Sequence, residues 1–183
     1  MTGGVPQFRP LTRDDFALLA AWLDEPHVAR WWRDPHRPDD LEAMYGPTID
    51  GTDPAEVRIV TVDGTAVGLI QRYRLRDEAA WRAALAPSGV AADAFGIDYL
   101  IGDADRIGRG LGTRMIATFV TDSWDRYPEG TACVVGVHRD NRRSVRALGR
   151  AGFVPVWEGE LDSGDPGDDG PQIVLVLPRP ACG

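Results

Sequence analysis

A glycine-rich turn between a strand pattern and a helix pattern constrains the fold more than any other feature of the sequence. In DADRIGRGLGTRM, Gly108, Gly110 and Gly112 stand at alternate positions, with arginines among and beside them. FGIDYLIG before the turn predicts a strand over 95–102, and the apolar face after it predicts a helix over about 110–125. A strand that leads through such a turn into a helix is typical of α/β proteins.

The composition of this turn suits the binding of an anion. Glycine lets the backbone approach a ligand closely and adopt positive φ angles. The first N–H groups of a helix lack partners within the helix, and the helix dipole adds positive potential at the same end. Arg106, Arg109 and Arg114 supply side chains for charge-assisted bonds. The pattern favours a phosphate site, and the alternative is a turn that only connects strand and helix.

Two common phosphate-binding turns do not fit the sequence. A P-loop ends in Gly-Lys-Ser/Thr, and this turn contains no lysine. A dinucleotide-binding turn lies near an N-terminal strand and precedes an acidic residue by about twenty positions. Here the turn follows the fourth expected strand, and the downstream pattern differs.

The rest of the chain predicts a mixed sheet. EVRIVTVDGTAVGLIQRYRL places two β-branched runs around Asp63-Gly64, which is a hairpin signal. Adjacent strands therefore mix with helical crossovers. We predict an α/β (α+β) fold, with a mixed central sheet of about six to seven strands and helices on both faces. The length of 183 residues predicts a single domain over residues 1–183.

Three helices are expected before the hairpin. The first follows Thr12 as a plausible N-cap and ends at Pro26. HVARWWRD predicts a second short helix that Pro35 closes. PDDLEAMYGPTID predicts a third that ends near Gly46-Pro47, because proline interrupts a helix.

The charge of the chain bears on its partners. The formal net charge is −8, so nucleic acid is a poor candidate, because a polyanion favours a basic surface. ELDSGDPGDDG contains five carboxylates and no base. It is either a solvated loop or one wall of a site for an amine.

No His/Cys/Asp set has the spacing of metal ligands, so no metal is expected. No apolar run approaches the ~20 residues of a membrane span, so we expect a cytoplasmic protein without a membrane partner.

The paired motifs resemble those of the GNAT superfamily of acyl-CoA-dependent N-acyltransferases. RGLGTRMI looks like the acetyl-CoA pyrophosphate loop of that family, and NRRSVRALGRAGF is similar to its N-x-x-A/S-x-x-x-Y/F/L-x-x-x-GF helix. The likeness runs from Phe8 to Pro178. It implies a GNAT fold with acetyl-CoA as co-substrate. One departure is Ile107, where the family usually has Gln or Arg, although backbone donors do not need that side chain.

The resemblance also implies which residues bind the cofactor. The turn and its helix would hold the pyrophosphate, and the strand DYLIG would leave a backbone N–H for the thioester carbonyl. The implied residues are Leu100, Ile101, Arg106, Gly108, Arg109, Gly110, Leu111, Gly112, Thr113 and Asn141.

Within the superfamily, the sequence resembles aminoglycoside 6′-N-acetyltransferases. LTRDDFALLAAWLDEPHVARWW, GID, GLGT and DGP all match that family. The resemblance implies that Asp98 holds the acceptor amine and takes its proton, and that Asp169 binds amino groups of the aminoglycoside. It also implies an aromatic lining of the sugar pocket by Trp31, Trp32, Tyr45 and Tyr73.

The chemistry of amine acetylation supports a role for Asp98. Ammonium is not a nucleophile, so a carboxylate must orient the amine and help to remove its proton. Asp98 alternates with Ile97 and Tyr99, so it can face a cleft while they face the core. The alternative is a strand-end carboxylate paired with an arginine. For Asp169 the alternative is a plain turn residue. One of Trp31 and Trp32 is expected in the core.

A second departure leaves rival functions open. Many family members have a tyrosine in the last helix that can protonate the leaving thiolate, and Leu148 stands at that position. His27 and His138 are weaker candidates for that role. Rival interpretations are a siderophore-pathway acyltransferase acting on a hydroxylysine, and a non-catalytic acyl-CoA sensor.

The expected partner is a small polyamine or aminosugar, and the expected state is a monomer or weak homodimer.

Overall fold

The computed structural model describes residues 4–181, and they form two compact units. The first unit contains the chain up to Gln71 together with Asp98–Leu111. The second contains Arg72–Ile97 and the chain from Gly112 onward. The expectation of a single domain over the whole chain stays a prediction.

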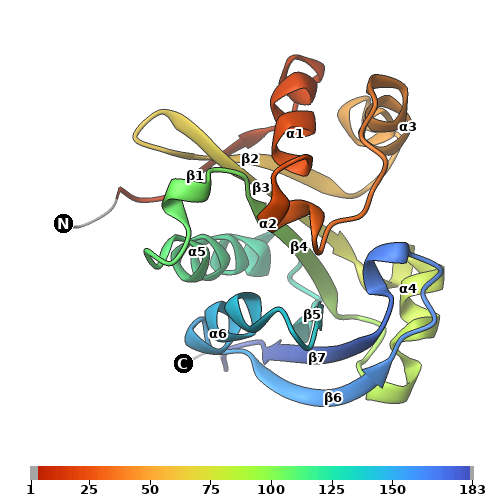
Figure 1. Cartoon of the computed structure of the whole chain (residues 1–183). Helices are drawn as coiled ribbons and strands as arrows, with labels where there is room; N and C mark the ends of the chain where they lie inside the picture. Colours follow the sequence, from red (N-terminus) through yellow and green to blue (C-terminus); the bar gives the residue numbers. More distant parts are fainter. Residues whose placement is uncertain (1–3, 182–183) are drawn as a thin grey trace. The chain divides into compact units, whose positions relative to one another are not determined.

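A mixed seven-stranded sheet runs through the described chain, in the order β1-β2-β3-β4-β5-β7-β6 (Figure 1). β1 pairs with β2 in antiparallel fashion, β4 with β5 in parallel, and β7 with both β5 and β6 in antiparallel fashion. The predicted mixed sheet is therefore confirmed. The strands are β1 (Gln7–Pro10), β2 (Glu56–Val62), β3 (Thr65–Arg74), β4 (Phe95–Ile101), β5 (Ala132–His138), β6 (Val154–Glu160) and β7 (Pro171–Pro178). The helices are α1 (Phe16–Leu23), α2 (Pro26–Ala29), α3 (Pro38–Ile49), α4 (Ala79–Ala84), α5 (Leu111–Arg126) and α6 (Arg142–Arg150).

The hairpin between β2 and β3 turns at the predicted dipeptide. Asp63 has a φ of 52° and Gly64 a φ of 77°. Two consecutive positive φ angles are the signature of a type I′ turn, whose twist matches that of the flanking strands.

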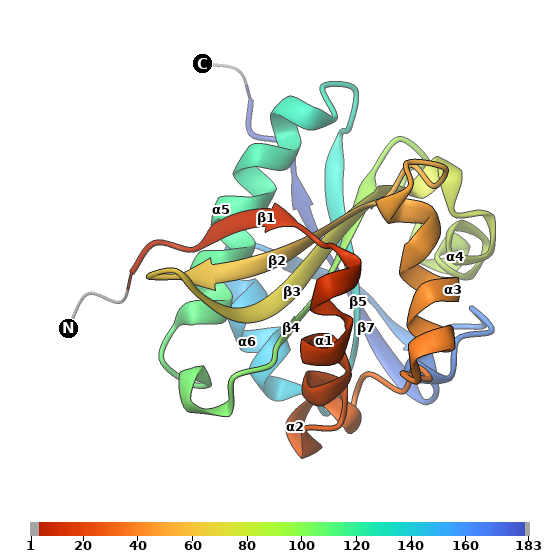
Figure 2. The same ribbon diagram turned by 90° about the horizontal axis from the view of Figure 1, so that it is seen from above.

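The core of the first unit lies between its helices and its strands. α1 and α3 pack side by side (Figure 2). Burial of one large aliphatic side chain contributes roughly 1.5–3 kcal/mol, so this cluster holds the helices on the sheet. The buried cluster comprises Leu11, Leu19, Trp22, Leu23, Val28, Leu41, Tyr45, Val57, Ile59, Leu69 and Leu100.

The sheet of the second unit is covered on both faces, as predicted. On one face, Trp81 of α4 lies over Gly136 of β5, where a Cβ would come within 2.6 Å of the indole. On the other face, Phe95 of β4 contacts the rings of Trp124 in α5 and of Tyr127, the residue that follows α5. Its centroid is 4.8 Å from that of Trp124 and 5.4 Å from that of Tyr127.

α2 is shorter than the sequence predicts. Pro26 begins this helix rather than ending α1, because proline suits the first position of a helix. The helix ends at Ala29, and the carbonyl of Val28 accepts bonds from both Trp31 N and Trp32 N, each at 2.9 Å. The expectation that HVARWWRD is helical up to Pro35 is therefore wrong.

α3 continues through its proline, so the expected end near Gly46-Pro47 is wrong as well. The Asp50 N–H still donates to the Gly46 carbonyl at 2.9 Å, and the Pro47 carbonyl accepts from Thr52 N at 2.9 Å.

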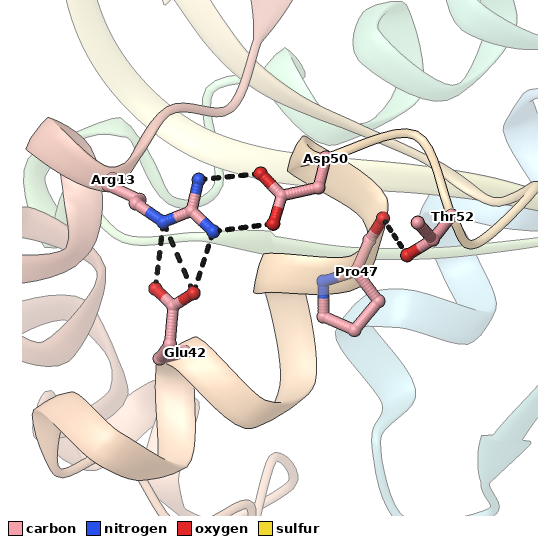
Figure 3. A network of polar contacts seen from close by, with 5 residues as sticks. All are labelled: Arg13, Glu42, Pro47, Asp50 and Thr52. Carbon is pink, nitrogen blue, oxygen red and sulfur yellow. Dashed lines mark hydrogen bonds and ion pairs between the residues drawn. The ribbon is translucent and has the colours of Figure 1, made fainter.

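One arginine braces the helix on both sides of the proline. Arg13 Nε and Nη2 donate to Glu42, at 2.9 Å and 2.7 Å, while Nη1 and Nη2 donate to Asp50, each at 2.9 Å (Figure 3). This contact is a tertiary one, and a local reading of the sequence does not reveal it.

No helix in the part of the chain that the structure describes is both long and apolar enough to cross a membrane.

Candidate active site

The predicted catalytic carboxylate, that of Asp98, lies in the middle of β4. Asp98 is half-buried, and Oδ2 accepts a hydrogen bond from Gln71 Nε2 of β3 at 2.9 Å. Alternation along the strand puts Asp98 on the same face as Leu100, whose side chain packs in the core of the first unit. The Asp98 carboxylate therefore lies on the face of β4 that the helices of the first unit cover.

Contacts from three elements fasten the end of β4. His27 Nε2 of α2 donates to the Ile101 carbonyl at 2.8 Å. Gly102 N donates to the Val67 carbonyl of β3 at 2.9 Å. The indole of Trp22 lies on Gly102, where a Cβ would come within 2.1 Å of the ring. His27 thus anchors the end of the strand that contains Asp98.

Tyr45 of α3 joins this region. Its residue surface is only 2% exposed. Burial raises the pKa of this hydroxyl, and the carboxylates of Asp34 and Asp98 raise it further. The phenol therefore stays neutral and keeps its proton for donation.

Sequence reasoning missed Asp34. The residue is half-buried and lies in the segment between α2 and α3. No motif marks it, because its nearness to Tyr45 depends on the path of that segment.

The two neighbouring tryptophans have different surroundings. Trp32 packs against the core of the first unit, as expected for one of the pair, and its buried Nε1 has no partner within the described chain. Trp31 is partly exposed, and the Arg30 guanidinium lies 4.6 Å from its ring centroid.

The glycine turn has the expected backbone. Gly108 and Gly110 have φ angles of 77° and 76°, a region that glycine adopts without strain. Gly112 already belongs to α5, a helix of 16 residues. Gly108, Arg109 and Gly110 are exposed. The turn thus presents exposed backbone at the N-terminus of a long helix, which is a favourable place for a phosphate.

Arg106 and Leu111 hold the turn in place. Asp103 caps the preceding 3₁₀ turn by accepting from Asp105 N at 3.0 Å, and Arg106 Nε lies 3.4 Å from Asp103 Oδ2. Leu111 is 3% exposed and anchors the start of α5.

The second unit contains the other predicted cofactor residues. Thr113 Oγ1 donates to the Ala147 carbonyl at 3.4 Å, which joins the first turn of α5 to α6. Asn141 caps α6, and its Oδ1 accepts from Ser144 N at 3.2 Å. The side-chain amide NH₂ of Asn141 takes no part in that cap.

Tyr73 and Leu148 are both buried in this unit. The Tyr73 ring lies on Gly96 of β4, where a Cβ would come within 2.4 Å of it, and the residue is 9% exposed. Leu148 is fully buried. An apolar core side chain therefore occupies the position at which many members of the family that this sequence resembles have a tyrosine.

In the acidic loop, the two adjacent aspartates differ. Asp169 is exposed, whereas Asp168 is half-buried and accepts from Ser163 Oγ at 2.6 Å. Burial raises the pKa of the Asp168 carboxyl, although the Ser163 bond opposes the shift. The buried amide of Gln172 donates to the Asp168 carbonyl at 2.9 Å. Asp168 therefore helps to hold the loop, and Asp169 projects from it.

Among the described residues, no group of three or more His, Cys, Asp or Glu side chains could hold a metal ion.

Comparison with known proteins identifies the family. Residues 12–161 match the family model described as an acetyltransferase (GNAT) domain. The chain therefore belongs to the GNAT acetyltransferase family. It is 29% identical over 177 residues to aminoglycoside N(6′)-acetyltransferase type 1 of Klebsiella pneumoniae, which covers 94% of this chain and 83% of the relative.

Solved structures agree with this assignment. A crystal structure of aminoglycoside acetyltransferase AAC(6′)-Ib in complex with coenzyme A and kanamycin superposes with a TM-score of 0.79 at 26% identity, covering 95% of both chains. A chimeric spermidine N-acetyltransferase from Vibrio cholerae and hSSAT has a TM-score of 0.71 at 15% identity, covering 96% of both chains. The second likeness concerns the fold alone.

Proposed function

We propose that this GNAT acetyltransferase transfers the acetyl group of acetyl-CoA to a primary amine of an aminoglycoside or related aminosugar. The observation that carries the proposal is the half-buried Asp98 in the middle of β4, which accepts a hydrogen bond from Gln71. The similarity to aminoglycoside 6′-N-acetyltransferases supports the choice of substrate class.

Asp98 acts on the acceptor in this proposal. Its carboxylate binds the ammonium group, takes one proton and leaves a neutral amine as nucleophile. The amine nitrogen attacks the thioester carbon, and the carbonyl oxygen of the tetrahedral intermediate accepts a bond from the backbone N–H of Leu100 or Ile101. The nitrogen of the intermediate then loses its second proton to solvent, and collapse breaks the C–S bond to give the acetamide and the CoA thiolate. Because the Leu148 side chain has no ionisable proton, water or another group protonates the thiolate.

The glycine turn holds the cofactor in this proposal. Backbone N–H groups of the turn and the first turn of α5 bind the pyrophosphate, and Arg106, Arg109 and Asn141 add polar contacts. The support is the positive φ of Gly108 and Gly110 and the exposure of the turn. A relative has been solved with coenzyme A.

Aromatic and acidic side chains recognise the acceptor in this proposal. Trp31, Trp32, Tyr45 and Tyr73 bind sugar surfaces and cations, as aromatic faces do. Asp169 binds a further amino group, which its exposure on the acidic loop permits. A cytoplasmic location and a monomeric or weakly dimeric state stay predictions.

The experiment is an assay of thiol release from acetyl-CoA with kanamycin, tobramycin and a lysine derivative. Rapid release with the two aminoglycosides alone would support the proposal. Release with the lysine derivative alone would contradict it. Acetyl-CoA binding without release for any acceptor would favour a non-catalytic acyl-CoA-binding protein, because Leu148 fills the position of the family's tyrosine.

A further inference from the structure

We propose that His27 is a positioning residue for the acetyl group: it fixes the end of β4 so that the backbone N–H of Ile101 meets the thioester carbonyl of acetyl-CoA. The inference rests on the proposed function, because that function assigns the thioester carbonyl to the N–H of Leu100 or Ile101. It adds the choice between these two donors and the side chain that holds the chosen one in place.

The direction of the backbone separates the two candidate donors. Along a strand, the N–H and C=O of one residue point to the same edge, and consecutive residues point to opposite edges. Gly102 N donates to the Val67 carbonyl of β3 at 2.9 Å. The alternation therefore turns Leu100 toward β3 as well, and the Leu100 carbonyl lies against Gly68 of that strand. Ile101 points to the other edge, so its N–H is the one that β3 does not use.

That other edge of β4 is paired over only part of its length. In the described part of the chain, the ladder between β4 and β5 includes only Phe95 and Gly96 of β4. The rest of the strand, as far as Ile101, therefore has no ladder partner from β5. A backbone N–H that the sheet does not use needs another partner, which a ligand can supply.

His27 reaches the same edge from α2. A carbonyl oxygen only accepts, so His27 Nε2 carries the proton of the 2.8 Å bond to the Ile101 oxygen. The peptide group between Ile101 and Gly102 is thus held at both ends, by His27 at its oxygen and by Val67 at its N–H. A rotation of this peptide group would move the end of β4. The two bonds prevent it, and a donor that is oriented in advance stabilises the developing oxyanion best.

The support of His27 is itself rigid. The next residue, Val28, is 5% exposed and belongs to the buried cluster of the first unit. The His27 side chain is only 20% exposed. The Trp22 indole of α1 lies on Gly102, directly after Ile101. Two side chains from α1 and α2 therefore hold the same peptide group, so the donor is in position before acetyl-CoA binds.

This role has a consequence that a purely structural role would lack. His27 transfers no proton and touches no reacting atom, because it acts through the Ile101 backbone. The Ile101 N–H donates to the carbonyl oxygen of the thioester, and free CoA has no such carbonyl. The loss of His27 should therefore weaken the binding of acetyl-CoA and leave that of CoA unchanged.

Calorimetry with acetyl-CoA and with CoA provides the first test. In His27→Phe, which keeps an aromatic ring without the donor, the affinity for acetyl-CoA should fall about 3- to 10-fold, the scale of one neutral hydrogen bond. The affinity for CoA should not change. The matched control is His36→Phe, because His36 lies in the same unit and bonds to Asp24 and the Asp34 carbonyl rather than to β4. It should leave both affinities unchanged.

Infrared spectroscopy of acetyl-CoA labelled at its carbonyl carbon observes the contact directly. A donated hydrogen bond weakens the C=O bond, so the carbonyl band should move to lower frequency when acetyl-CoA binds the unchanged protein. His27→Phe should lose most of this shift, whereas His36→Phe should keep it. With a saturating acceptor, kcat of His27→Phe should fall about 10-fold, less than the ~100-fold that the loss of a whole oxyanion donor costs.

Two polar variants keep the inference falsifiable if His27→Phe does not fold. His27→Gln puts an N–H near the position of Nε2, so it should restore the band shift and the affinity for acetyl-CoA. The side chain of His27→Asn is too short to reach the Ile101 carbonyl, so it should restore neither. Equal weakening of acetyl-CoA and CoA binding, or an unchanged band shift in either variant that lacks the donor, would overturn the role of His27.

These measurements separate the inference from the proposed acceptor, because neither uses an amine. If the unchanged protein acetylates no aminosugar, the proposed acceptor fails, and the band shift in the His27 variants still decides the inference. If acetyl-CoA binds the unchanged protein without a band shift, Ile101 does not donate to the thioester. The inference is then overturned, while the assignment of the cofactor stands.

Discussion

The side-chain amide of Gln71 donates a hydrogen bond to the carboxylate of Asp98 over 2.9 Å, from one strand to the next. The bond fixes the orientation of the proposed base on a backbone that His27 and Val67 also hold. A base must be aligned with the proton that it removes. The pair therefore provides two separate tests of the proposed reaction.

Replacement of the base tests the chemical step. Asp98→Asn should lower kcat at least ~100-fold, because the amide cannot take the proton. Binding of CoA, measured by calorimetry, should not change. Asp63→Asn, in the exposed hairpin turn, controls for the lost charge. Full activity of Asp98→Asn would remove this residue from the mechanism.

Replacement of the orienting residue should have a smaller effect. Gln71→Ala removes one hydrogen bond to a charged group, so kcat should fall about 10-fold, the scale of ~1.5 kcal/mol. Gln71→Glu should cost more, because it puts a like charge beside Asp98. Steady-state kinetics with a saturating acceptor measures both effects. A Gln71→Ala variant as impaired as Asp98→Asn would show that the amide does more than orient the carboxylate.

The glycine turn is tested by a side chain at a left-handed position. Gly110→Val should weaken CoA binding at least ~10-fold, because a Cβ at a φ of 76° distorts the backbone that receives the phosphate. Calorimetry with CoA measures the change. Gly89→Val is the matched control, since Gly89 has a φ of 71° and lies outside the turn. Both variants should lose stability, by ~1–2 kcal/mol. CoA affinity that is equal in both variants would place the phosphate elsewhere.

The turn was predictable from the sequence because its determinants are local. The strand, the positive-φ glycines and the following helix all depend on neighbouring residues, and the structure has each of them within two residues of the expected bounds. The Asp63-Gly64 hairpin was predictable for the same reason.

Features set by distant contacts could not be predicted. α3 passes Pro47 with a brace from Arg13, which comes from a different part of the chain. Asp34 belongs to no motif, and only the folded path of its segment brings it near Tyr45. In the acidic loop, the sequence DDG does not reveal that Asp168 turns inward.

The brace of α3 gives a prediction about pH. Arg13 lowers the pKa of the Asp50 carboxyl and that of Glu42. A carboxyl with a lowered folded-state pKa stabilises the protein above its unfolded value of about 4, and this contribution is lost as the pH falls through the folded value. Arg13→Met should therefore lower Tm at neutral pH, and the difference from the unchanged protein should disappear in acid.

Salt and a control variant complete that test. The three side chains are exposed, so high salt should shrink the difference in Tm measured by thermal denaturation. Arg82→Met, at an exposed position of α4, should change Tm little at any pH. A difference that persists at acidic pH would mean that the Arg13 stem stabilises α3 by packing rather than by charge.

The contribution of His36 to stability should change with pH in the opposite direction to that of the Arg13 contacts. Both ring nitrogens of His36 donate, to the Asp34 carbonyl and to Asp24. Two donors require the imidazolium form, and these bonds raise the pKa of His36 above its usual value. A raised pKa gives stability that is complete below about pH 6.5 and is lost as the pH rises through the folded value.

Nuclear magnetic resonance can follow this titration directly. The ring signals of His36 should report a pKa above about 6.5, and Asp24→Asn should lower it, because the Nε2–H then loses its anionic partner. Asp53→Asn, elsewhere in the same unit, should leave it unchanged. A His36 pKa that does not respond to Asp24→Asn would mean that the Asp34 carbonyl alone fixes the charged ring.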